Sequence, residues 1–193
     1  MRFTLSDDQQ EIKRTAKDLL AARAGTAQLR EHAEAGRYDD ALSKELAGLG
    51  WPGIAVAEEH GGQGLGLVEL CVLCEELGYA CAATPLLGSA LAALAIEHAG
   101  SAAQQSAWLP GLASGEQRGA LGAVGELIPV APGADVVVVL DGVGGAFIVT
   151  ADAVEAVDAI DSSRRYGRVA EAGGEALEGD VAGAVDRALV AVA

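Results

Sequence analysis

Three cysteines lie within eleven residues of one another, at Cys71, Cys74 and Cys81. Clustered thiolates can bind zinc, but a structural zinc site needs four ligands and no histidine is close to these cysteines in sequence. The three positions also fall on one stripe of a helix. We therefore interpret the cysteines as small buried hydrophobic side chains, and the sequence predicts no metal site.

The histidines give a weak signal for acid–base chemistry. His60 follows Glu58 and Glu59 and could exchange protons near neutral pH, although its place in a glycine-rich segment favours a structural role. His32 and His98 have no partner that the sequence identifies. A serine hydrolase is not indicated, because no G-x-S-x-G motif is present and Ser89 lies in a helical pattern.

The glycine-rich segment 50–66 holds seven Gly or Pro residues among its seventeen. Its glycines fit neither the G-x-G-x-x-G spacing of a dinucleotide site nor a phosphate-binding loop, because no Gly-Lys-Ser/Thr follows. No acidic residue stands in the strand–helix context that a Rossmann site requires. The sequence therefore predicts a structural loop whose backbone needs conformations that Cβ atoms obstruct.

In the first part of the chain, the elements that must position these residues are predicted to be helices. Ser6 and Gln9 form a predicted capping box, and apolar residues at steps of three and four predict helices at about 7–24, 38–49, 66–80, 85–99 and 101–109. Short apolar runs at 120–124, 134–140 and 146–149 predict buried strands, with a hairpin turn at 141–145 and weaker strands at 154–157 and 166–170. A helical pattern returns at residue 180. The predicted fold class is α+β, with an all-helical domain at 1–115, a short β domain at 116–179 and the start of a C-terminal helical domain at 180–193.

The acidic net charge of the chain disfavours some classes of binding partner. The net charge of −15 is uneven, since residues 51–193 hold nineteen Asp or Glu but five Arg and no Lys. Nucleic acid and anionic membrane surfaces are therefore disfavoured as partners. No run of 18 apolar residues predicts a membrane span, and the N-terminus has no apolar signal core. The odd number of cysteines suits a reducing compartment, so the predicted location is cytoplasmic.

Several segments together resemble the acyl-CoA dehydrogenase family. They are the Leu-Gly-Trp at 49–51 with the glycine-rich run that follows, the Glu-Glu-Leu-Gly at 75–78, the segment 108–116 and the segment 161–165. The resemblance implies an N-terminal helical domain followed by a β domain. It also implies FAD as cofactor, an acyl-CoA substrate in lipid metabolism such as fatty acid β-oxidation, and an oxidoreductase that forms the 2,3-enoyl thioester.

The same resemblance locates candidate site residues. Family members place Thr-Glu-Pro and Gly-Ser-Asp elements on the flavin, and the corresponding place here holds Val124, Gly125 and Glu126, which are the candidate cofactor contacts. A carboxylate removes the substrate α-proton in this family. Asp186 stands where a few members carry a Glu, but it is one methylene shorter, so the catalytic base stays unassigned.

The resemblance also implies a pocket and a partner. The family helix corresponding to 80–95 helps to line the acyl pocket. Small side chains would leave space there for an acyl group, and the candidates are Ala82, Ala83, Ser89 and Ala90. The alternative is that these small residues only allow tight packing of the core. The shortened β domain resembles divergent subunits of heteromeric actinobacterial enzymes, so we expect a homo- or hetero-oligomer with an acyl-CoA dehydrogenase subunit. The alternative is a non-catalytic structural subunit, or a truncated fragment, that binds no flavin alone.

Overall fold

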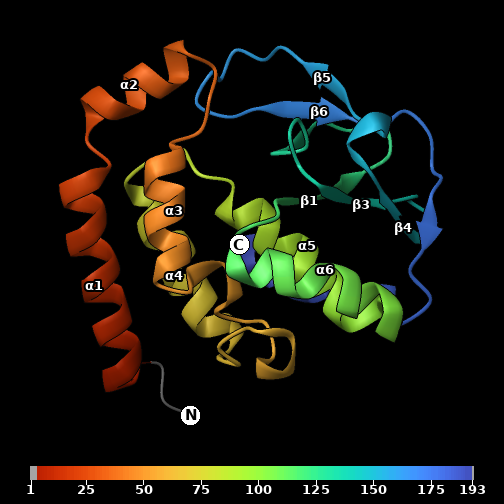
Figure 1. The fold of residues 1–193 in the computed structure, drawn as a ribbon, viewed down its shortest axis with the longest axis horizontal. Helices are drawn as coiled ribbons and strands as arrows, with labels where there is room; N and C mark the ends of the chain where they lie inside the picture. Colours follow the sequence, from red (N-terminus) through yellow and green to blue (C-terminus); the bar gives the residue numbers. More distant parts are fainter. Residues whose placement is uncertain (1–3, 193) are drawn as a thin grey trace.

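The computed structural model describes residues 4–192 and has an α+β fold, as the sequence predicts. Figure 1 shows α1, α3 and α4 on one side of the molecule, the strands on the other side, and α5 and α6 between them. The helices are α1 (Asp7–Arg23), α2 (Thr26–Glu34), α3 (Asp40–Gly48), α4 (Leu67–Tyr79), α5 (Leu86–Ala99), α6 (Ala102–Ser114) and α7 (Val181–Val192). Short 3₁₀ helices are η1 (Trp51–Gly53), η2 (Glu58–His60) and η3 (Ala151–Ala153).

The first helix begins as its sequence predicts. The Ser6 hydroxyl accepts a hydrogen bond from the Gln9 amide, and the Gln9 side chain accepts one from the Ser6 amide. This capping box satisfies two of the amide groups that a helix start leaves without partners. The Gln9 side chain also donates to Glu69 at 2.8 Å, which ties the start of α1 to α4.

Two helices differ from the prediction. Helix α2 was not predicted, because its sequence has no apolar period and His32 is its one buried side chain. Helix α6 was predicted to end at residue 109 but continues through Pro110 to Ser114. A proline inside a helix costs about 3 kcal/mol. Leu112 and Ala113, both buried beyond Pro110, offset that cost by packing into the core.

The strands form two small sheets. One sheet has the order β1 (Gly119–Ala123), β3 (Val136–Leu140), β4 (Ala146–Val149), β7 (Glu175–Ala176), with β1 and β3 parallel and the other pairs antiparallel. The other has the order β2 (Ile128–Pro129), β6 (Tyr166–Arg168), β5 (Glu155–Val157), all antiparallel. The predicted hairpin turn joins β3 to β4, where the Asp141 carboxylate accepts hydrogen bonds from the Val143 and Gly145 amides.

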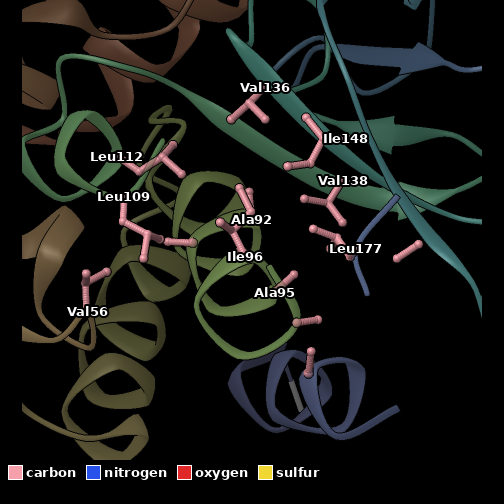
Figure 2. Packing of buried hydrophobic residues seen from close by; sticks show 14 of the residues in the cluster. Val56, Ala92, Ala95, Ile96, Leu109, Leu112, Val136, Val138, Ile148 and Leu177 are labelled. Carbon is pink, nitrogen blue, oxygen red and sulfur yellow. The ribbon is translucent and has the colours of Figure 1, made fainter. Parts of the chain in front are cut away.

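Helix α5 lies at the centre of the main core. Figure 2 shows Ala92, Ala95 and Ile96 facing Val136 and Val138 on the sheet. The alternate strand residues, such as Val137 and Val139, point to the other face and pack beneath the second sheet. This alternation is the period of two that a strand imposes. Because the helices and the sheet share one core, the division into domains at 115 and 179 stays a prediction.

The cysteines do not form the buried stripe that the spacing predicts. Helix α4 ends at Tyr79, so Cys81 lies outside it, exposed and with a φ of 49°. Cys71 and Cys74 are half-buried. The prediction was wrong for Cys81 because the helix stops before the third position of the stripe. Within residues 4–192, no helix is both long and apolar enough to cross a lipid bilayer.

Candidate functional site

The glycine-rich loop is held together by its own backbone. The amides of Gln63, Gly64 and Leu65 donate to the carbonyls of Gly53, Val56 and Ile54, at 2.9, 2.8 and 3.0 Å. A Cβ at position 62 would lie 2.0 Å from the Val56 carbonyl oxygen, so only glycine allows this approach. The loop amides therefore serve the fold, which agrees with the structural role predicted for this segment.

The candidate flavin segment forms a tight turn after β1. The Val124 amide donates to Leu140 (2.9 Å), the Gly125 amide to Val169 (2.9 Å) and the Glu126 amide to Ala123 (3.2 Å). Gly125 has a φ of 76° and is exposed, as is the Glu126 side chain. The turn thus uses all three of its amide donors inside the protein.

These hydrogen bonds determine whether the turn can bind a flavin through its main chain. A flavin held by main-chain donors needs free N–H groups, and Gly125 offers no hydroxyl in their place. In this conformation Val124, Gly125 and Glu126 do not fit a flavin bound in that way. The Glu126 carboxylate, the one polar side chain in the turn, is an acceptor when ionised. Flavin binding at these three residues therefore stays a prediction.

The small residues expected to line an acyl pocket are distributed over several environments. Ala90 is buried in the helical core. Ser89 is buried, and its hydroxyl accepts a hydrogen bond from the Gly119 amide at 3.0 Å, which joins α5 to β1. Ala82 and Ala83 border a void of about 10 Å³, which holds at most one water molecule. Of the four, Ser89 alone lines a larger cavity.

That cavity has a volume of about 250 Å³ and lies between α3, the first turn of α5 and the connection from α6 to β1. Lys44, Thr84 and Arg118 contribute polar side chains from these three places. The cavity was not predicted, because its walls come from three segments that are far apart in the sequence and carry no shared motif. The one signal in the sequence was Ser89, a polar residue in an apolar helical pattern.

The other candidate acid–base residues do not converge on a site. Asp186 is exposed on α7, as expected for a solvated acid. The His32 imidazole lies 3.2 Å from the Asp39 carboxylate, and its Nδ1 is buried without a hydrogen-bond partner. Burial lowers the pKa of His98, and the positive charge of Arg187 lowers it further. Within residues 4–192, His, Cys, Asp and Glu form no cluster that could hold a metal ion.

Comparison with known proteins gives consistent matches. The family model "Acyl-CoA dehydrogenase, N-terminal domain" matches residues 6–116. The acyl-CoA dehydrogenase IpdE2 of Mycobacterium tuberculosis is 35% identical over 121 residues, which cover 62% of this chain and 37% of that protein.

Solved structures extend the match to the β region. A variant of the Tcur3481-Tcur3483 steroid ACAD superposes with a TM-score of 0.84 at 29% identity, over 98% of this chain and 62% of that one. The ChsE4-ChsE5 complex of Mycobacterium tuberculosis has a TM-score of 0.77 at 22% identity, over 99% of this chain and 61% of that one, and shows the shared fold. The chain spans less than two thirds of the length of each of these relatives. The match of the family model to more than half of the sequence shows that the chain belongs to the acyl-CoA dehydrogenase family.

Proposed function

We propose that this chain is a subunit of an acyl-CoA dehydrogenase assembly that carries out α,β-dehydrogenation of an acyl-CoA thioester with FAD as hydride acceptor. A partner subunit, or a C-terminal helical domain, supplies the catalytic base and most of the flavin contacts. The observation that carries this proposal is the superposition of 98% of the chain on one chain of a steroid ACAD that is named for two components. The assembly would serve lipid metabolism, including fatty acid β-oxidation. A cytoplasmic location also stays a prediction.

The turn at 123–126 supports the need for a partner. Its three amides already donate to protein carbonyls, so it has no free main-chain donor for a flavin. The same observation favours a second candidate function, a non-catalytic subunit that stabilises a complete partner and contacts no flavin. The two candidates differ in whether this chain contributes to the cofactor site of the complex.

Co-expression with candidate acyl-CoA dehydrogenase subunits tests the proposal. We expect the isolated chain to be colourless and the purified complex to be yellow and to reduce an artificial electron acceptor in the presence of an acyl-CoA. Steroid-derived and short branched acyl-CoA thioesters are the first substrates to test, since relatives are named for steroid and isovaleryl substrates. A chain that forms no complex with any such subunit would refute the proposal that a partner subunit supplies the missing groups.

A matched pair of variants separates the two candidates. If the turn faces the cofactor in the complex, Glu126→Gln should change its flavin content or spectrum. Glu171→Gln alters another exposed carboxylate outside the turn and should have no effect. A complex in which Glu126→Gln changes neither flavin content nor activity would favour the non-catalytic role.

A further inference from the structure

Three side chains that line the cavity between α3, α5 and β1 have hydrogen-bond donors without a protein acceptor among the described residues. Lys44 forms no salt bridge within residues 4–192, and the Thr84 hydroxyl forms no hydrogen bond there. Ser89 is 5% exposed, and its hydroxyl accepts from the Gly119 amide but has no acceptor for its own hydrogen among the described residues. Lys44 is exposed and Thr84 half-buried, so water can solvate both, whereas the hydrogen of the buried Ser89 hydroxyl gains most from a bound acceptor.

Two acidic side chains, Asp40 and Glu116, also line the cavity. The Asp40 carboxylate accepts a hydrogen bond from the Arg118 guanidinium at 2.6 Å, and its side chain is largely exposed. That contact uses one N–H group of Arg118 and leaves others free. Glu116 also borders the cavity but is exposed to solvent. The lining is thus formally neutral, with two carboxylates and two cations, and it leaves the Lys44 ammonium, the remaining Arg118 N–H groups and the hydroxyls as donors to an acceptor group.

The cavity also has an apolar part of its lining. It consists of Leu46, Pro52, Pro85 and Leu86, of which the first two come from the helical part that precedes α4. A volume of about 250 Å³ holds roughly eight non-hydrogen atoms at about 30 Å³ each. Such a site suits a small molecule with an acceptor group at one end and a short hydrocarbon body at the other.

The cavity is separate from the candidate flavin turn. It touches Arg118, which precedes β1, whereas the turn follows Ala123 at the end of that strand. A strand of five residues spans roughly 16 Å. A molecule of about eight atoms in the cavity would therefore not contact the turn.

We propose that this cavity binds a small organic monocarboxylate. The carboxylate accepts hydrogen bonds from Lys44, Arg118 and the Thr84 or Ser89 hydroxyl, and its hydrocarbon chain packs on the apolar lining residues. This proposal depends neither on flavin binding nor on a partner subunit, so it goes beyond the proposed function and can fail independently of it.

Calorimetric titration of the purified chain tests the proposal with butyrate as the probe. Butyramide has the same shape without the charge, and inorganic phosphate has charge without the hydrocarbon body. We expect saturable binding of butyrate, with butyramide and phosphate each weaker by at least about tenfold, since hydrogen bonds to charged groups are stronger than neutral ones. Absence of saturable butyrate binding, or equal binding of butyramide or phosphate, would overturn the proposal.

Two substitutions place the binding in the cavity. Lys44→Met removes the ammonium and keeps an unbranched side chain, and we expect it to weaken butyrate binding at least about tenfold. Thr84→Val removes the hydroxyl at nearly constant shape and should weaken binding by a smaller factor. Lys17→Met is the matched control, because Lys17 is exposed on α1 away from the cavity. Equal loss in Lys17→Met and Lys44→Met, or no loss in both Lys44→Met and Thr84→Val, would show that butyrate binds elsewhere.

Discussion

Substitution of Gly62 by alanine tests whether the glycine-rich loop serves the fold. The new Cβ would lie 2.0 Å from the carbonyl oxygen and 2.5 Å from the carbonyl carbon of Val56. Ordinary contact between such atoms needs about 3.5 Å, so the two arms of the loop must separate by more than ~1 Å. Val56 is almost fully buried in the main core, which limits its movement.

The size of the effect follows from the hydrogen bonds that this separation breaks. Three backbone bonds cross the loop, from the amides of residues 63, 64 and 65. At about 1 kcal/mol each, their loss lowers the free energy of unfolding by about 3 kcal/mol. For a chain of this length, that corresponds to a decrease in Tm of roughly 6–12 °C.

Urea unfolding followed by far-UV circular dichroism measures this change, with two glycine controls. Gly48→Ala, at the end of α3, meets nothing within 4 Å and should be neutral or stabilising by up to about 1 kcal/mol. Gly61 has open space but a φ of 84°, so Gly61→Ala should cost about 1–2 kcal/mol. If Gly62→Ala unfolds at the same urea concentration as Gly48→Ala, the close approach does not constrain the loop and our reasoning is wrong.

Three further predictions concern individual side chains. The hydrogen bond from Gln9 lowers the pKa of Glu69. The contribution of the Glu69 carboxylate to stability is therefore present above the ordinary Glu pKa and is lost as pH falls through the lowered value. An NMR titration in which Gln9→Leu leaves the Glu69 pKa unchanged would contradict this cause. Burial raises the pKa of Cys74 to about 12, so iodoacetamide at pH 8 should label exposed Cys81 well before Cys74. Mass spectrometry measures the two labelling rates, and equal rates would contradict the burial of Cys74. The buried Gln104 side chain donates to a β7 carbonyl at 3.0 Å and caps α6. Gln104→Ala should therefore lower the free energy of unfolding in urea by about 1–3 kcal/mol. An unchanged urea midpoint would contradict that role.

Most of the helical fold could be predicted because its elements carry local signals. Capping boxes start α1 and α6, and apolar spacing marks α4 and α5. Helix α2 lacks both signals, since Gly25 provides no side-chain cap and His32 is its one buried side chain. Its buried side chain, His32, contacts Asp39 at the start of the next helix, and an apolar period does not show such a polar contact.

The candidate sites could be predicted less well, because they depend on contacts between distant segments. The turn after β1 is recognisable from Gly125, but two of the three acceptors of its amides belong to β3 and to the segment after β6. The cavity likewise joins Lys44 to Arg118, which are far apart in the chain. Residue type at one position could not reveal either arrangement.

The hydrogen bonds of the turn set a requirement for any flavin complex. If Val124, Gly125 and Glu126 are to donate to a cofactor, their amides must first leave the carbonyls of Leu140, Val169 and Ala123. At about 1 kcal/mol for each bond, this opening costs about 3 kcal/mol, which lowers affinity by roughly a hundredfold. A partner that holds the flavin through its own groups avoids this cost. The geometry of the turn therefore favours an assembly in which the flavin is bound chiefly outside residues 123–126.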